Sequence, residues 1–230
     1  MPCILLYGTD EFAISRRLKD FESDFNDPTS ADMNTARLDA RTVSDNDLNN
    51  AVNAMPFLAK RRLVLLANPS SKYNNVASRK KFLEYIEKTP ETTRLVLYES
   101  VEPRDADKHW LVKWAAKNES AKAEALMAPK PRDMNGWIIN EMKRQGGKIS
   151  SEAAGKLSEL VGADTRQAAQ EIAKVLAYVN WARPVEVQDV AAVCISTAEV
   201  DIFAFVDSLA AGDGQQSQSM LRKMLEEQDA

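Results

Sequence analysis

The chain has 230 residues, of which 44% are apolar and 28% are charged, the balance of a globular protein that can bury a sizeable core. Its formal net charge of −4 argues against a protein that binds nucleic acid through overall positive charge. This length suffices for one large domain or two modest ones.

The first 130 residues alternate between strand-like and helix-like segments. Short apolar runs predict strands at residues 3–7, 35–38, 63–67 and 94–98. Apolar residues at helical spacing predict helices over residues 12–25, 44–55, 82–86 and 110–114. Pro28 is expected to stop the first helix, Ser44 to cap the second, and residues 68–71 to form a turn. The alternation predicts a parallel sheet with helices on both faces, over residues 1–130.

After residues 129–131 the pattern predicts helices only. Four amphipathic segments, at residues 133–146, 150–162, 164–179 and 186–193, form a small helical bundle over 131–197. Trp137 and Trp181 fit the apolar faces of this bundle and are expected to anchor its core. A further helix pair begins near Val200, and it resembles the opening of a third, all-α domain, over 198–230, that is cut short.

The turn after the first strand occupies the place of a phosphate-binding loop. Such a loop needs two spaced glycines, a lysine and a hydroxyl, so that backbone N–H groups wrap the phosphate. Gly8 is the only glycine before Gly136, and Asp10 and Glu11 would repel a phosphate. We therefore interpret Asp10 and Glu11 as residues that stabilise the start of a helix, and we expect no nucleotide cofactor.

Other chemistry is sparse. His109 is the only histidine and is expected to be exposed or near a helix cap, and Glu99 is a lone carboxylate at a strand end. Cys3 and Cys194 are far apart and lack metal-ligand spacing, which fits a reducing cytosol. We expect no catalytic residue and no metal site.

Targeting signals are also missing from the pattern. The apolar run at residues 3–7 has no basic leader before it, so it is not read as a signal peptide. No stretch approaches the roughly 18 apolar residues of a membrane span. We expect a cytoplasmic protein with no membrane partner.

The segment at residues 55–58 (Met-Pro-Phe-Leu) carries apolar residues where a helix should already have ended. Pro56 cannot lie inside a helix without losing a hydrogen bond. Phe57 and Leu58 are therefore placed at a helix end or in a loop, directly before a basic triplet at residues 60–62. A large apolar pair in such a place marks a binding surface, and the alternative is that both side chains belong to the core.

At this point the chain resembles the delta subunit family of the bacterial DNA polymerase III clamp loader. The resemblance extends over almost the whole length. It is carried by residues 6–12, 54–64, 137–138, 147–150, 160–166, 171–174, 202–209 and 212–213. No single one of these pieces is a strict signature, but their order and spacing together are specific.

The resemblance implies an AAA+-like module without ATPase machinery, with no activity of its own, inside the DNA polymerase III holoenzyme, a DNA-directed DNA polymerase and hence a nucleotidyltransferase. It implies a subunit that binds the sliding clamp (beta) and opens or holds open its ring, together with delta-prime and gamma/tau subunits. The positions that match the family's clamp-binding pair are Phe57 and Leu58, with Met55 and Pro56 shaping the turn. Arg166 lies near the position of a sensor arginine, although a surface or interdomain arginine is the alternative.

Two points stay open at this stage. Family members continue into a complete third helical domain, the collar, of which only the first helices are expected here, either because the chain is a fragment or because it is short by nature. The alternative functions are a free-standing nucleic-acid-binding module that uses the basic clusters, or an NTPase-related module of the AAA+ class. Contact with DNA is expected to be weak or to occur through the assembled complex.

Overall fold

The computed structural model describes residues 3–25 and 28–194, together with isolated positions between 205 and 221. Apart from those positions, the helix pair and the incomplete collar predicted over 198–230 lie outside the described residues. The chain divides into two compact units, residues 1–128 and 129–230.

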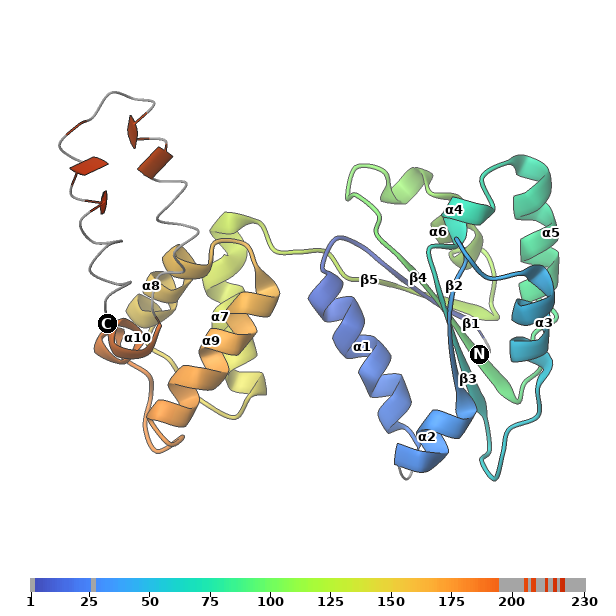
Figure 1. Cartoon of the computed structure of the whole chain (residues 1–230), viewed down its shortest axis with the longest axis horizontal. Helices are drawn as coiled ribbons and strands as arrows, with labels where there is room; N and C mark the ends of the chain where they lie inside the picture. The colour runs from blue at the N-terminus through green and yellow to red at the C-terminus, as the bar shows by residue number, and fades with distance from the viewer. Residues whose placement is uncertain are drawn as a thin grey trace. The chain divides into compact units, whose positions relative to one another are not determined.

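The first unit is an α/β unit (Figure 1). Its strands are β1 (Cys3–Tyr7), β2 (Thr35–Asp39), β3 (Arg62–Ala67), β4 (Thr93–Glu99) and β5 (Ala121–Ala125). Its helices are α1 (Glu11–Ser23), α2 (Pro28–Asn34), α3 (Asp45–Asn53), α4 (Pro69–Lys72), α5 (Val76–Ile86) and α6 (Trp110–Ala115), with a 3-10 helix η1 (Ala106–Lys108). The strands form one sheet in the order β2-β3-β4-β1-β5, and all its pairs are parallel.

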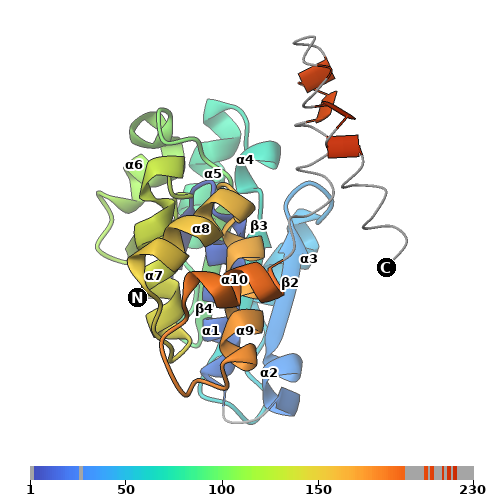
Figure 2. The same ribbon diagram turned by 90° about the vertical axis from the view of Figure 1, so that its left-hand side faces the viewer.

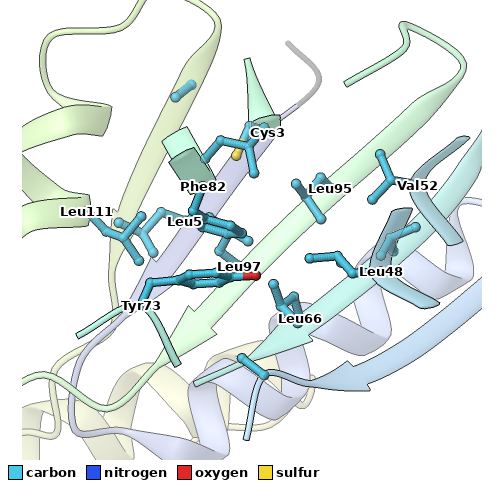
Figure 3. Packing of buried hydrophobic residues seen from close by; sticks show 14 of the residues in the cluster. Cys3, Leu5, Leu48, Val52, Leu66, Tyr73, Phe82, Leu95, Leu97 and Leu111 are labelled. Atoms are coloured by element: carbon cyan, nitrogen blue, oxygen red, sulfur yellow. The ribbon is translucent and has the colours of Figure 1, made fainter. Parts of the chain in front are cut away.

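Helices cover both faces of this sheet, as predicted (Figure 1). Successive residues of a strand point to opposite faces, so Cys3 and Leu5 pack on one side of β1, and Ile4 and Leu6 on the other. The first side meets α3, α5 and α6, and the second meets α1. Figure 3 shows the first cluster, in which the rings of Tyr73 and Phe82 stack with centroids 4.0 Å apart.

The four predicted strands are present, and the differences have local causes. The edge strand β5 was not predicted, because its sequence (Ala-Lys-Ala-Glu-Ala) lacks the β-branched and aromatic residues that mark strands. Pro28 was expected to stop the first helix, but α1 already ends at Ser23, and Pro28 instead begins α2, where its missing N–H has no role. The turn predicted over residues 68–71 overlaps the one-turn helix α4, which begins at Pro69 for the same reason.

The described part of the second unit is a bundle of helices that pack against one another (Figures 1 and 2). They are α7 (Met134–Arg144), α8 (Ser151–Val161), α9 (Thr165–Tyr178) and α10 (Val187–Val193), preceded by a 3-10 helix η2 (Pro131–Asp133). The side chains of Ser150 and Asp164 accept hydrogen bonds from the first turns of α8 and α9, as N-cap residues do. No helix among the described residues is both long and apolar enough to span a membrane.

The two tryptophans of the bundle differ from each other. Trp137 packs against the buried cluster of this unit, as predicted. Trp181 was wrongly predicted as a core anchor. It follows α9 in a left-handed backbone conformation (φ +53°), its side chain is 53% exposed, and its Nε1 donates to the carbonyl oxygen of Gln145 at 3.1 Å.

Candidate partner-binding site

The segment at residues 55–58 leaves the helix as its proline requires. The side chain of Ser44 caps the start of α3 by accepting a hydrogen bond from the Asp47 N–H at 3.1 Å. Helix α3 ends at Asn53, and Ala54 already has an extended backbone. A residue before proline is disfavoured in the helical region, so Met55 cannot continue the helix. Met55, the last residue of the helix predicted over 44–55, lies beyond α3, and its side chain is 79% exposed.

Phe57 and Leu58 are both exposed. The exposed fraction is 54% for Phe57 and 91% for Leu58, whereas Pro56 is half-buried. Leu58 also has a positive φ of +50°, a conformation that costs a leucine free energy and persists only where the surrounding structure fixes it. These exposures exclude the alternative in which both side chains belong to the core.

The backbone beneath this pair is held by Asn34, a residue that sequence reasoning missed. Asn34 ends α2 and is fully buried. Its Oδ1 accepts from the Phe57 N–H at 2.7 Å, and its Nδ2 donates to the Phe57 carbonyl oxygen at 2.9 Å. No spacing rule connects residues 23 positions apart, so only the fold reveals this contact.

The chain after Leu58 is fixed again where β3 begins. The Arg62 N–H donates to the carbonyl oxygen of Thr92 at 2.8 Å, and Arg62 Nε donates to that of Ala51 at 3.0 Å. Lys60 and Arg61 are exposed, and neither forms a hydrogen bond or an ion pair among the described residues. The loop from Met55 to Arg61 is thus anchored at its middle and at its end.

A groove of about 740 Å³ runs beside Leu58. Its walls combine aromatic and basic side chains, and the lining residues include Phe21, Phe25, Leu58, Lys60, Arg61 and Arg94. Arg94 forms an ion pair with Asp24, which also lines the groove. Leu58 therefore borders a groove whose charged lining residues are mostly basic, in a chain whose net charge is negative.

The turn after β1 differs from this loop because it is closely packed and its backbone N–H groups are paired within the protein. Gly8 has a φ of +142°, and a Cβ at this position would lie 2.1 Å from the backbone oxygen of Leu126. The Gly8 N–H donates to Glu99 at 3.4 Å, and the Asp10 N–H to Leu126 at 3.0 Å, in both cases to the carbonyl oxygen. The Asp10 side chain caps α1 by accepting from the Ala13 N–H at 2.9 Å. These N–H groups are already paired within the protein, so they are not free to wrap a phosphate.

A buried polar cluster lies next to this turn. Glu99 ends β4 and accepts hydrogen bonds from the Ser70 N–H at 3.0 Å and the Ser70 hydroxyl at 2.9 Å. His109 is the N-cap of α6, as its predicted place near a cap required, but its side chain is only 17% exposed. Its Nε2 lies 3.1 Å from Ser70 Oγ and 3.2 Å from Glu99 Oε1, and Trp110 Nε1 donates to Ser70 Oγ at 2.8 Å.

This cluster does not form a nucleophile activated by a base. The Ser70 hydroxyl gives its single proton to Glu99, so His109 is placed to donate from Nε2 rather than to accept. The Nδ1 of His109 has no hydrogen-bond partner among the described residues. Chiefly burial, and secondarily the charge of Arg79, lowers the pKa of His109, against the opposing effect of Glu99. The cluster therefore joins α4, β4 and α6 as a structural network.

Comparison with known proteins places this chain among replication proteins. The profile of the family described as "DNA polymerase III, delta subunit" matches residues 4–124, which is more than half of the chain. The chain belongs to this DNA polymerase III delta subunit family. The α/β unit has the AAA+-like fold that was expected from the resemblance.

Two relatives give the measure of this similarity. The chain is 24% identical over 220 residues to DNA polymerase III subunit delta of Bacillus subtilis, an alignment that covers 90% of this chain and 61% of the relative. It therefore spans less than two thirds of that relative's length. The solved structure of the Bacillus subtilis DNA clamp loader delta protein matches with a TM-score of 0.80 at 19% identity, and the match covers 99% of this chain and 68% of that one.

Within this delta-family chain, the remaining candidate groups are an arginine, two cysteines and any cluster of metal-ligating side chains. Arg166, compared above with a sensor arginine, is exposed at the start of α9. Burial raises the pKa of the Cys3 and Cys194 thiols to about 12, so both cysteines are unreactive near neutral pH. The described residues contain no group of three or more histidine, cysteine or acidic side chains that could hold a metal ion.

Proposed function

We propose that this chain binds the sliding clamp through Phe57 and Leu58 and opens or holds open the clamp ring during DNA replication in the cytoplasm. The observation that carries the proposal is the pair of exposed apolar side chains on a backbone that the fold holds in place. Met55 and Pro56 shape the turn that presents them. The chain would act without ATPase activity of its own, beside delta-prime and gamma/tau subunits.

The physical argument concerns what such a pair gains on binding. Phe57 and Leu58 have most of their apolar surface still in water, and burying a side chain of this size contributes about 1.5–3 kcal/mol. Few residues carry most of the energy of an interface, and large apolar anchors that enter a pocket are among them. Two such anchors on one fixed turn can enter a pocket on a partner and compete with the contacts that the partner makes with itself.

The decisive experiment is the double substitution Phe57→Ala with Leu58→Ala, measured as the equilibrium affinity for the sliding clamp of the same organism. With about 2 kcal/mol lost at each anchor, we expect the affinity to fall by about a thousandfold. The thermal midpoint should stay within a degree or two of the unsubstituted chain, since both side chains are exposed in the free protein.

The matched control is Val76→Ala. Val76 begins α5, is apolar and is 81% exposed, but it lies on another element of the same unit. This variant should bind the clamp with unchanged affinity. Wild-type affinity of a folded double variant would refute the proposal.

Nucleic acid is a second candidate partner, since Lys60 and Arg61 are exposed and unpaired among the described residues. Contact with DNA through a few basic side chains is weak and falls steeply with added salt. We propose such contact only as a contribution inside the clamp loader. A titration of the isolated chain with DNA at low salt should therefore show little binding, and tight binding there would favour the nucleic-acid module instead.

A further inference from the structure

Asn34 forms hydrogen bonds with the backbone of Phe57, a contact that could not be predicted from the sequence. It is the last residue of α2 and has no exposed surface. Its carboxamide uses both kinds of hydrogen-bonding atom on a single residue, Phe57: Oδ1 accepts from the N–H at 2.7 Å and Nδ2 donates to the carbonyl oxygen at 2.9 Å. A second proton of Nδ2 goes to the carbonyl oxygen of Ser30, also at 2.9 Å. The side chain thereby ties the end of α2 to the middle of the 55–61 loop.

This role is specific to a carboxamide of this length. A carboxylate can accept from the Phe57 N–H but cannot donate to its carbonyl oxygen, and an apolar side chain can do neither. The side chain supplies both halves of the pairing that a neighbouring strand would supply to Phe57. Removing this side chain should therefore destabilise the loop conformation, because no neighbouring strand among the described residues forms hydrogen bonds with the backbone of Phe57.

The loop needs this support because it carries exposed apolar side chains. Leu58 is 91% exposed and has a positive φ, and the side chains on either side of Pro56 are exposed as well. Without a fixed backbone, an exposed apolar segment samples many conformations and can turn its side chains against its own surface. Ordering it on binding would then reduce the affinity, whereas a loop already in its binding conformation avoids that loss.

We infer that Asn34 is a positioning residue for partner binding, which holds Phe57 and Leu58 in the conformation that enters the partner. The inference rests on the proposed function of these two side chains and adds to it a residue that touches no partner. It predicts that affinity can be lost without removing an atom from the contact surface.

The first test is Asn34→Leu, which keeps the number and branching of the side-chain heavy atoms and removes all three hydrogen bonds. The matched control is Thr93→Val: Thr93 is 1% exposed, and its Oγ1 donates to the carbonyl oxygen of Val52 at 2.8 Å, so this change also removes a buried bond from side chain to backbone. Both variants should lower the stability of the α/β unit. Only Asn34→Leu should lower clamp affinity, by about tenfold or more, and only it should speed hydrogen exchange of the Phe57 amide.

The second test uses Asn34→Asp and serves if the leucine variant does not fold. At pH 8 the carboxylate cannot donate, so clamp affinity relative to the unsubstituted chain should fall. At pH 5 a buried carboxyl group takes up a proton and regains one donor, so this relative affinity should recover at least in part. A residue that served the general stability of the fold alone would show no such recovery.

The outcomes separate the inference from the function on which it rests. If Phe57→Ala with Leu58→Ala abolishes binding while Asn34→Leu binds as the unsubstituted chain does, only the positioning role is refuted. Equal losses for Asn34→Leu and Thr93→Val would refute it too, because stability alone would then explain both. If the double variant binds normally, the proposed function fails, and the positioning role falls with it.

Discussion

The turn after β1 and the loop over residues 55–61 belong to the same α/β unit and have opposite designs. In the turn, Gly8 packs against the backbone of Leu126, and the N–H groups of Gly8 and Asp10 are paired within the protein. In the loop, Asn34 holds the backbone of Phe57 and the start of β3 holds the loop's end, while the large side chains stay exposed. The turn after β1 occupies the position of a phosphate-binding loop, but the N–H groups of Gly8 and Asp10 are already paired. The 55–61 loop is the better candidate site, because its apolar side chains remain exposed for a partner.

The substitution expected to have the largest effect is Gly8→Ala, which should lower the stability of the α/β unit. A Cβ at this position would overlap a backbone oxygen, which cannot rotate away as a side chain can, and φ would remain unfavourable for alanine. Together these should lower the free energy of unfolding of the α/β unit by about 3 kcal/mol or more. Urea unfolding measures this loss.

The control for this change is Gly136→Ala, which lies in α7 with no atom within 4 Å of the added Cβ. It should stabilise the helical unit by about 0.5–1 kcal/mol, since alanine is the better helix former. An unchanged unfolding midpoint for Gly8→Ala would mean that the turn is open enough to admit a ligand, and the comparison would fail.

The sequence allowed prediction of the parts of the fold whose residues carry a local signal. The buried strands β1, β3 and β4 are continuous apolar runs, and the caps Ser44, Ser150 and Asp164 precede periodic helices. Such signals depend on near neighbours, so they survive without knowledge of the fold.

The parts that were missed depend on contacts between distant residues. Strand β5 forms because β1 offers it an unpaired edge, not because its own residues favour a strand. The exposure of Phe57 and Leu58 was inferred from Pro56, but their anchor Asn34 comes from another helix. Trp181 was misplaced because an apolar face was extended past the end of α9, where the backbone turns left-handed.

An intermediate effect is expected from Lys60→Glu with Arg61→Glu. Both side chains are exposed and unpaired among the described residues, so reversing them should leave the stability of the unit nearly unchanged. If the clamp surface beside the apolar pocket is acidic, the association rate should fall by roughly tenfold at low salt, and the loss should shrink as salt is added. The dissociation rate should change little.

The measurement is the association rate at several salt concentrations. Its control is Lys80→Glu, a single reversal on α5, whose Lys80 pairs at the surface with Glu84. If the double reversal leaves the association rate unchanged at low salt, the basic lining of the groove has no part in binding. The binding site would then consist of Phe57 and Leu58 alone.

The smallest effect should be a dependence of the α/β unit's stability on pH through His109, in the polar cluster beside the turn after β1. Burial, with a smaller contribution from Arg79, lowers the pKa of His109 in the folded protein, although Glu99 opposes this. The unfolded chain, whose histidine has a pKa of about 6.5, therefore binds the proton more readily. The contribution to stability is present above about pH 6.5 and is lost as pH falls from there toward the lower pKa of the folded state.

Urea unfolding of the α/β unit at pH 7.5, 6.5 and 5.5 measures this loss, and His109 is the only histidine of the chain. His109→Gln keeps a donor near Ser70 and Glu99 but cannot titrate, so its stability should fall less over the same interval. Clamp affinity should not follow this titration, because the cluster joins α4, β4 and α6 and, among the described residues, forms no hydrogen bond with the 55–61 loop. If clamp affinity did follow the protonation of His109, the two regions would be coupled, and the division between a closed turn and an open loop would have to be abandoned.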